Sequence, residues 1–250
     1  MKDIKIKDNE RVDDLQCKGY RLIQDPTKFC FGLDAVLLSD FARVSVGEKV
    51  LDMCTGTGII PILMAAKTVA ESFKAIEIQP EFVDVARRSV ALNDFDNRID
   101  IIEGDIKHIS EYIPKSSMDA VTCNPPYMIE KHGIINEADS KTIARHEIMC
   151  SLEDVIRAGA VSLKPGGNFY MIHRPFRLTE ILVMLTKYKL EPKRIRFVYP
   201  YVDKEPNMVM IEAKRGGKSR VTVEKPLIVY ESVGKYTEEI YKIYGRSSKN

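Results

Sequence analysis

The sequence predicts an α/β protein with a mostly parallel sheet and helices on both of its faces. Short apolar runs of strand length alternate with longer stretches of helical period along the chain, which is the pattern of repeated strand–helix–strand units. No internal repeat or low-complexity linker divides the chain. Its 250 residues, 44% hydrophobic and 30% charged, are enough for one large domain with a sizeable core.

Seven segments are expected to form strands: Lys49–Met53, Phe73–Ile78, Asp100–Glu103, Asp119–Cys123, Asn168–Ile172, Ile195–Tyr199 and Met208–Ala213. Helices are expected over Ile59–Val69, Pro80–Leu92, Leu152–Leu163 and Pro175–Tyr188. The connection Pro200–Asn207 is too short for a crossover helix, so the last two strands should pair as an antiparallel hairpin. We therefore expect a seven-stranded sheet in which one edge strand is reversed.

Composition excludes several classes of protein. No N-terminal stretch has the features of a signal peptide, and no apolar run is long enough to span a membrane, so a soluble cytoplasmic protein is expected. Neither a C-x-x-C pair nor a histidine pair at ligand spacing occurs, so neither a disulfide framework nor a metal site is expected. The five cysteines are Cys17, Cys30, Cys54, Cys123 and Cys150.

Charge is distributed unevenly between the two parts of the chain. Residues 151–250 contain 19 Lys and Arg against 11 Asp and Glu, a net charge of +8, whereas the whole chain has a net charge of only +2. Such asymmetry suits a polyanion that approaches one side of the molecule. Solvated basic faces are also common on soluble domains, so charge alone leaves nucleic-acid binding open.

A glycine-bearing turn follows the first expected strand. The stretch Val50–Gly58 reads VLDMCTGTG and leads directly into a helix, and its glycines let a backbone pass close to a ligand. A dinucleotide-binding turn would have a third glycine where this chain has Pro61, and the Gly-Lys-Ser/Thr of a phosphate-binding loop is absent. By itself the motif also fits an ordinary turn between a strand and a helix.

Acidic residues follow three successive strands, at Asp52, Glu77 and Asp105. In open α/β sheets the ends of these strands border the ligand crevice. There Glu77 could accept hydrogen bonds from both ribose hydroxyls, and Asp105 could accept one from an adenine amino group. The alternatives are a surface glutamate for Glu77 and a helix N-cap for Asp105. An adenosyl cofactor without phosphates fits three carboxylates, because phosphates would be repelled.

The motif Asn124-Pro125-Pro126-Tyr127 directly follows an apolar strand and is more specific. Two prolines remove two backbone donors, so the local polar groups are mainly acceptors, as an exocyclic amine requires. The Asn124 side-chain oxygen and the Pro125 carbonyl could accept both amine hydrogens and favour the pyramidal, nucleophilic nitrogen. Tyr127 offers a face on which a planar base can stack. A rigid proline turn capped by asparagine is the structural alternative.

These residues resemble class I methyltransferases of the Asn-Pro-Pro-Tyr type, and most closely the bacterial tRNA1(Val) adenine-N6 methyltransferase family. The similarity runs through Tyr20–Gln24, Phe31–Ala35, Ala75–Gln79, Ala144–Glu147 and Tyr236–Glu239. It implies a Rossmann-like class I fold, S-adenosyl-L-methionine as cofactor, tRNA as substrate and methyl transfer to adenine N6, in the anticodon loop. Cys54 departs from the glycine that is common at its position.

The resemblance also assigns residues. Asn124, Pro125, Pro126 and Tyr127 are expected to hold the target base. The expected cofactor contacts are Phe31, Asp34, Asp52, Cys54, Thr55, Gly56, Gly58, Glu77, Ile78, Asp105, Ile106 and Asn124. Residues 1–45 would form an extension that covers the cofactor, with Phe31–Asp34 as its lid, and residues 214–250 a basic C-terminal segment of the same domain.

Substrate RNA is expected to contact Tyr127 and a set of basic side chains. These are His146, Arg194, Arg196, Lys214, Arg215 and Lys218. Alternation along a strand would place Arg194 and Arg196 on one face. The same charges could instead protect a sheet edge from aggregation.

His108, His132 and His173 are interpreted as surface or packing residues, since an amine nucleophile needs no strong base before the chemical step. A monomer is expected.

Three other functions share some of these features. A guanine-N2 methyltransferase for ribosomal RNA and a protein glutamine N5-methyltransferase would use the same motif, although the latter usually has a separate N-terminal helical domain for which this chain leaves little room. An RNA-binding module with a structural cofactor is the non-enzymatic alternative, and the intact Asn124 argues against it.

Overall fold

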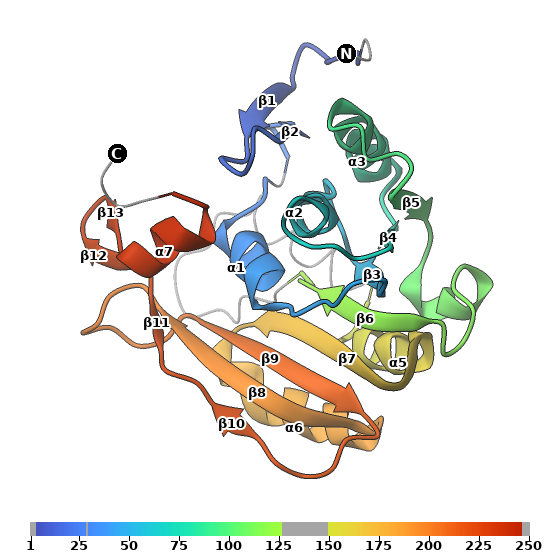
Figure 1. The fold of residues 1–250 in the computed structure, drawn as a ribbon, viewed down its shortest axis with the longest axis vertical. Helices are drawn as coiled ribbons and strands as arrows, with labels where there is room; N and C mark the ends of the chain where they lie inside the picture. The colour runs from blue at the N-terminus through green and yellow to red at the C-terminus, as the bar shows by residue number, and fades with distance from the viewer. Residues whose placement is uncertain (1–3, 29, 127–149, 247–250) are drawn as a thin grey trace.

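The computed structural model describes residues 4–28, 30–126 and 150–246. A nine-stranded sheet crosses the molecule in the order β10-β8-β9-β7-β6-β3-β4-β5, with β11 also paired to β8 (Figure 1). Its strands are β3 (Lys49–Met53), β4 (Ser72–Glu77), β5 (Ile99–Glu103), β6 (Met118–Cys123), β7 (Leu163–His173), β8 (Leu190–Tyr199), β9 (Met208–Arg215), β10 (Thr222–Val223) and β11 (Leu227–Ile228). The seven long strands are those expected from the sequence.

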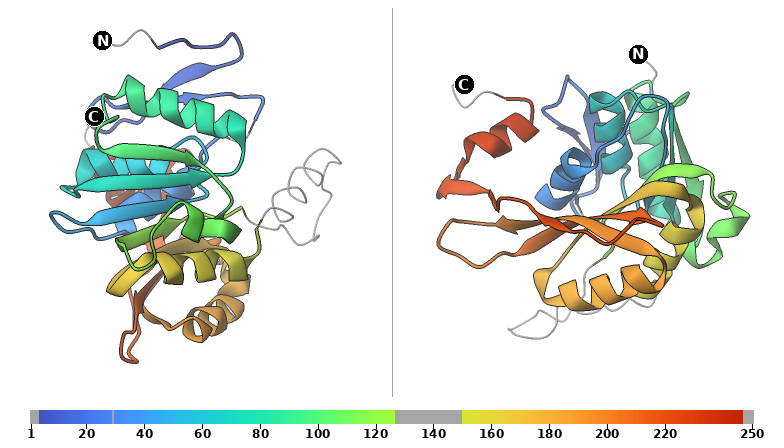
Figure 2. Two further views of the ribbon diagram at one scale, coloured as in Figure 1. Left: turned by 90° about the vertical axis from the view of Figure 1, so that its right-hand side faces the viewer. Right: turned by 60° about the horizontal axis from the view of Figure 1, so that its bottom comes forward.

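Helices cover both faces of this sheet (Figure 2). On one face lie α1 (Leu33–Phe41), α2 (Ile59–Lys67) and α3 (Pro80–Leu92), and on the other α5 (Leu152–Ser162) and α6 (Leu178–Lys187), with the short 3-10 turns η1 (Ile106–Glu111) and η2 (Pro175–Arg177). Because side chains alternate along a strand, Val50 packs into the core under α1–α3 and Leu51 into the core under α5 and α6. The predicted α/β class is confirmed.

The reversed strand lies inside the sheet and not at its edge. β8 and β9 form the expected antiparallel hairpin, but β9 pairs with β7 on its other side, from Asn168↔Lys214 to His173↔Val209. The helix α6 carries the chain past the position of β9, so the hairpin folds back into the gap between β7 and β8. The expected edge position was therefore wrong, and the edge is occupied by the two-residue strands β10 and β11.

The N-terminal region packs closely on the sheet domain. β1 (Arg11–Asp14) and β2 (Arg21–Gln24) form a separate antiparallel pair, and Arg88 on α3 binds both carboxylate oxygens of Glu10 at 2.7 and 2.6 Å. The following α1 is a core helix, in which Leu37 and Leu38 are at most 1% exposed. Residues 33–41 are thus part of the packed domain, and the predicted lid ends inside the first turn of this helix.

The C-terminal region returns to the side of α1. β12 (Tyr230–Ser232) and β13 (Lys235–Tyr236) form a hairpin that precedes α7 (Glu238–Ile243), and the rings of Tyr230 and Tyr236 stack with centroids 5.1 Å apart. In Figure 1 this unit lies beside α1. Among the residues that the structure describes, no helix has the length and apolar content that crossing a membrane requires.

Candidate active site at the carboxyl edge of the sheet

The glycine turn and the proline motif begin side by side. β3 and β6 are neighbouring parallel strands in which Met53 pairs with Cys123, so Cys54 and Asn124 are the next residue of each. Both motifs therefore emerge at the same edge of the sheet, here called the carboxyl edge, at which the parallel strands end. This is the position of the ligand crevice in open α/β folds.

The turn after β3 has three residues in the left-handed region. Cys54, Gly56 and Gly58 have φ values of 57°, 55° and 83°. A Cβ on Gly58 would lie 3.3 Å from the Cβ of Ala86 on α3, so glycine allows close helix packing there. A Cβ on Gly56 would meet nothing within 4 Å, so only its φ requires glycine. Cys54 adopts the same region with a side chain, at a cost in strain.

Asp52 is the most unusual acidic residue at this edge. Its side chain is 0% exposed, and Oδ1 accepts a 2.6 Å hydrogen bond from the Thr122 hydroxyl on β6. Among the described residues, Asp52 Oδ2 and Thr55 Oγ1 are buried side-chain atoms without a hydrogen-bond partner. Burial raises the pKa of Asp52 to about 7, against the opposing effects of the Thr122 hydroxyl and of the nearby Thr55 hydroxyl. A ligand that donates hydrogen bonds here would give these oxygens a partner and would favour the ionised form of Asp52.

Glu77 links the ends of β3 and β4. Oε2 accepts from the backbone N–H of Gly56 at 2.9 Å, and Oε1 accepts from the N–H groups of Ile78 and Gln79 at 3.0 Å each. Glu77 is 5% exposed, so it is not the surface residue that was considered as an alternative. Its carboxylate holds the glycine turn against β4, next to the position where a ribose would lie.

Asp105 follows β5 and caps the next turn. Its Oδ1 accepts from the backbone N–H of Lys107 at 2.8 Å, which is the N-cap role considered from the sequence. Its Oδ2 lies 4.0 Å from Lys107 Nζ. The cap fixes the side chain at the crevice and leaves the predicted adenine contact to Oδ2. Ile106 is buried beside it, and Ile78 is partly exposed after Glu77.

Asn124 contacts the first turn of α1 at the carboxyl edge. Its side-chain nitrogen donates a 3.0 Å hydrogen bond to Oδ2 of Asp34, in the first turn of α1. Pro125 is buried and Pro126 partly exposed. The predicted base-stacking residue Tyr127 and the predicted substrate residue His146 lie outside the described residues. The expected cofactor residue Phe31 donates its backbone N–H to the side-chain oxygen of Gln24 at 2.9 Å.

The two arginines predicted to bind RNA have partners within the protein. Arg194 is 8% exposed and binds Glu212 at 2.7 Å, Glu224 at 3.1 Å and the carbonyl oxygen of Phe41 at 2.6 Å. Arg196, which points to the same face, binds Glu239 at 2.7 Å. These bonds engage both guanidinium groups in holding β8 to its neighbours, and we leave both residues out of the RNA contact proposed below.

The other three basic residues lie at the opposite end of the sheet. β9 is antiparallel to β7, so Lys214 and Arg215 are near the edge where the parallel strands begin, here called the amino edge, and Lys218 follows them. Arg215 also donates to the hydroxyl of Ser116 at 2.8 Å. The length of the strands therefore separates this patch from Asn124, so the patch and Asn124 do not form one compact substrate site.

Comparisons with known proteins agree with this geometry. A family model for the TRM5/TYW2 methyltransferase domain matches residues 16–148. The tRNA1(Val) (adenine(37)-N6)-methyltransferase of Parabacteroides distasonis is 31% identical over 201 residues, covering 79% of this chain and 81% of the relative. The chain belongs to this methyltransferase family. A relative with the same name from Porphyromonas gingivalis is 29% identical, covering 93% of each chain.

Solved structures of other methyltransferases share the fold of this chain. An Agrobacterium tumefaciens protein described as a predicted O-methyltransferase superposes with a TM-score of 0.70 at 22% identity, covering 85% of this chain and 95% of its own. Geranyl diphosphate C-methyltransferase from Streptomyces coelicolor, solved with S-adenosyl-L-homocysteine, gives 0.55 at 14% identity, covering 73% and 75%. At these identities the likeness is one of fold alone.

The residues of the crevice fit S-adenosylmethionine, the cofactor of this methyltransferase family. The buried Asp52 Oδ2 and Thr55 Oγ1 have no hydrogen-bond partner within the described residues. The pKa of Asp52 is about 7, so a bound ammonium group beside it would favour its ionised form. Carboxylates at the ends of three adjacent strands disfavour a phosphate-bearing ligand. The described part of the chain contains no group of three or more His, Cys, Asp or Glu side chains arranged to bind a metal ion.

Two residues of the site were not predicted from the sequence. Thr122 orients Asp52 from the neighbouring strand, and Gln24 anchors the backbone at Phe31. Thr122 and Asp52 are 70 residues apart in sequence, and the available signal for Thr122 was a hydroxyl residue in a largely apolar strand two residues before Asn124. Gln24 lies in the stretch Tyr20–Gln24 that carries the resemblance, but nothing in the sequence indicated that its side chain holds the backbone of Phe31.

Proposed function

We propose that this protein transfers a methyl group from S-adenosylmethionine to the exocyclic N6 of adenine 37 in the anticodon loop of tRNA1(Val). The observation that carries the proposal is the pairing of Met53 with Cys123, which aligns the glycine turn with Asn124 at one edge of the sheet. Membership of the adenine-N6 methyltransferase family supports the choice of adenine over guanine and over a protein amide.

The proposed chemistry is transfer between a bound sulfonium and a bound amine. The cofactor supplies an electrophilic methyl group on its sulfur. Asn124 and the Pro125 carbonyl would accept the two N6 hydrogens, which localises the nitrogen lone pair toward the crevice. Because the reacting groups are held in line, alignment can supply on the order of 7–11 kcal/mol of the barrier reduction.

Proton removal needs no dedicated base before the transfer. The product amine is cationic directly after methyl transfer, and its proton is then acidic enough to leave to water or to a neighbouring acceptor. Asp52 is not proposed as that acceptor, because it is completely buried and bonded to Thr122. Its proposed role is to hold the cofactor.

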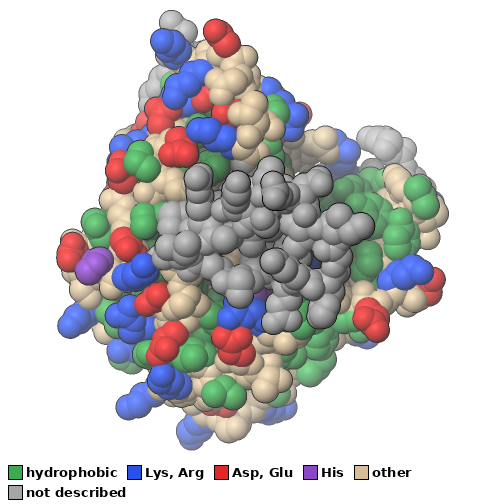
Figure 3. Space-filling view, turned by 180° about the vertical axis from the view of Figure 1, so that it is seen from behind, with side chains coloured by type: hydrophobic (Ala, Val, Ile, Leu, Met, Phe, Trp, Pro, Cys, Tyr) green, Lys and Arg blue, Asp and Glu red, His purple; other side chains and the backbone are tan. Residues whose placement is uncertain are grey.

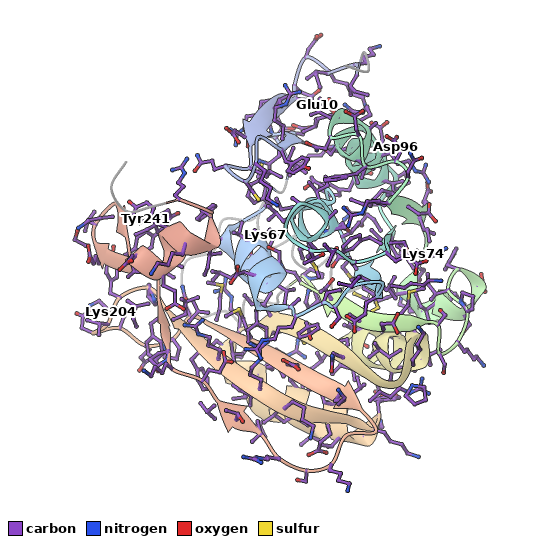
Figure 4. All side chains as sticks on the ribbon, viewed as in Figure 1. Glu10, Lys67, Lys74, Asp96, Lys204 and Tyr241 are labelled. Atoms are coloured by element: carbon purple, nitrogen blue, oxygen red, sulfur yellow. The ribbon has the colours of Figure 1, made fainter. Side chains whose placement is uncertain are left out.

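The tRNA is proposed to approach the carboxyl edge near the loop 200–207, which follows β8 there. Figure 4 shows Lys204 on this loop, across the molecule from Lys74 on β4. On the face shown in Figure 3, lysine and arginine side chains lie among carboxylates, so phosphate contacts there would compete with acidic neighbours. We therefore place the RNA contact at the loop that carries Lys204, and expect a monomer acting on cytoplasmic tRNA.

Labelled cofactor tests this proposal directly. The purified protein is incubated with methyl-labelled S-adenosylmethionine and total tRNA, and the tRNA is then digested to nucleosides. We expect the label in N6-methyladenosine, and faster labelling of a loop adenine than of the same adenine in a duplex, because extruding a base is cheapest when it is unpaired. Label in N2-methylguanosine or in protein would identify one of the other functions.

A further inference from the structure

The contact between Asp34 and Asn124 joins two segments that are 90 residues apart in sequence. The Asn124 side-chain nitrogen donates to Asp34 Oδ2 at 3.0 Å. Asn124 begins the loop after β6, whereas Asp34 is the second residue of α1. The contact therefore fixes the side chain of a loop residue to a packed helix.

The carboxylate of Asp34 is itself held in one place. Its Oδ1 accepts from the backbone N–H of Ala35 at 2.9 Å, at the helix N-terminus where a negative charge is favoured. A Cβ on Gly32 would lie only 2.7 Å from this oxygen, so any larger residue there would displace the carboxylate. The helix behind it is rigid, because Leu37 and Leu38 are at most 1% exposed.

An amide side chain needs such a partner to have a defined orientation. The oxygen and nitrogen of an asparagine have nearly the same shape, and hydrogen bonding determines which end points where. A carboxylate can only accept, so it selects the NH2 end of Asn124 and turns the oxygen toward the opposite side. The reversed amide would present an NH2 group to the substrate amine, which is also a donor.

We propose that Asp34 is a positioning residue that fixes the Asn124 amide with its oxygen toward the target amine. This proposal rests on the proposed function and adds a role for Asp34 besides the cofactor contact expected from the sequence. Asp34 does not contact the reacting atoms in this role, and it acts through Asn124 alone. Its removal should lower turnover and leave much of the cofactor affinity intact.

The orientation of the amide can be observed without measuring activity. In protein labelled with ¹⁵N-asparagine, the Asn124 side-chain NH2 resonances, assigned with Asn124→Ala, should show slow hydrogen exchange and two well-separated proton shifts. Asp34→Ala should abolish this protection. Asp40→Asn, which changes an acidic residue at the other end of α1, is the matched control and should leave the resonances unchanged. Identical Asn124 signals in wild type and Asp34→Ala would overturn the proposal.

Kinetics distinguish positioning through Asn124 from a general structural effect. Asp34→Ala should lower single-turnover methylation about 10- to 100-fold, the scale of a misplaced reacting group. In an Asn124→Ala background the same change should add less than about 2-fold, because residues that act as a unit are not additive. Full additivity would contradict the proposal.

Exchanging the two residues provides a rescue experiment. Asn124→Asp alone places two carboxylates against each other and should be nearly inactive. Adding Asp34→Asn restores a donor–acceptor pair and leaves one oxygen of the new carboxylate for the amine, so activity should recover at least about 10-fold over Asn124→Asp alone. No recovery would contradict the positioning role. A wild-type protein that methylates no tRNA would refute the proposed function, and the NMR comparison would still decide the role of Asp34.

Discussion

Two aspartates at opposite edges of the sheet show how differently this fold treats the same side chain. Asp119 is the second residue of β6, at the amino edge, and both of its oxygens accept hydrogen bonds, from Lys164 Nζ at 2.6 Å and from the N–H of Lys49 at 2.9 Å. Against the effect of partial burial, these bonds hold the pKa of Asp119 below its usual range. Asp52 at the carboxyl edge is completely buried, has an unpaired oxygen and has its pKa raised to about 7.

This difference indicates that the amino edge of the sheet contributes to stability, whereas the carboxyl edge is arranged for binding. Ion pairs across strand ends continue along the amino edge, as between Lys49 and Glu71 at 3.5 Å and between Lys74 and Asp100 at 3.5 Å. The carboxyl edge instead combines left-handed turn residues with buried groups that lack partners. Such local costs are typical of a site that is completed by a ligand.

The largest expected effect is at Asn124. Asn124→Ala should lose about 100-fold or more in single-turnover rate, by analogy with deleting one preorganised partner of a transition state. Cofactor affinity measured by calorimetry should stay nearly unchanged, since the cofactor contacts come mainly from other strands. A variant with near-normal turnover would show that the motif does not activate the amine.

Glu77 is expected to affect cofactor binding most. Glu77→Ala should weaken S-adenosylmethionine binding about 10-fold or more, because charge-assisted hydrogen bonds are worth roughly 1.5–3 kcal/mol each. Glu77 also holds the N–H of Gly56, so thermal stability should fall too. Glu77→Gln is the matched control with nearly the same shape, and it should recover part of the stability and little of the affinity. Unchanged affinity in both variants would reject the ribose assignment.

Asp52 and Asp119 should respond to pH in opposite directions. Because the folded-state pKa of Asp52 is raised to about 7, its ionisation increasingly destabilises the cofactor-free protein as pH rises from the unfolded-state pKa of about 4 to about 7. Asp52→Asn should therefore raise the melting temperature at pH 8 more than at pH 5, and weaken cofactor binding.

Asp119→Asn is the contrasting variant. The folded-state pKa of Asp119 is lowered, so its stabilisation is present above its unfolded-state pKa and is lost as pH falls through the folded value. The substitution should cost roughly 1 kcal/mol at pH 7, less at pH 3, with turnover unchanged. Thermal denaturation across pH 3–8 checks both variants, and equal pH dependence of the two would remove the contrast between the edges.

The smallest expected effect distinguishes the edges as RNA surfaces. Neutralising Lys204, in the loop that follows β8 at the carboxyl edge, should reduce the salt dependence of tRNA binding by about 0.7–0.9 in slope per lost phosphate contact. Neutralising Lys214 near the amino edge is the matched control and should change the slope less. Filter binding over a range of salt concentrations measures both, and the reverse ranking would restore the basic patch first predicted from the sequence.

The sequence predicted the strands and the motifs because both are local properties. Alternation and turn residues located β3 to β9, and Asn124-Pro125-Pro126 was identified from its own chemistry. The position of β9 within the sheet could not be predicted, because it depends on which neighbour the hairpin meets after α6. Sequence periodicity does not encode that choice.

The sequence predicted which residues lie at the carboxyl edge but not the partners that they bind. Asp52, Glu77 and Asp105 do end adjacent strands, yet the bond from Thr122 to Asp52 and the bond from Asn124 to Asp34 depend on strand register and helix docking. Arg194 shows a second limit, because the sequence did not indicate that this basic strand residue forms buried ion pairs with Glu212 and Glu224. Charge in a sequence does not reveal exposure.

The most direct test of the central claim is nucleoside mass spectrometry of purified tRNA1(Val) from cells with and without this protein. Cells that lack it should lose N6-methyladenosine from the anticodon loop, and the wild-type gene should restore it whereas an Asn124→Ala gene should not. The modification persisting without the protein, or returning with Asn124→Ala, would contradict the account of a methyltransferase site at the carboxyl edge.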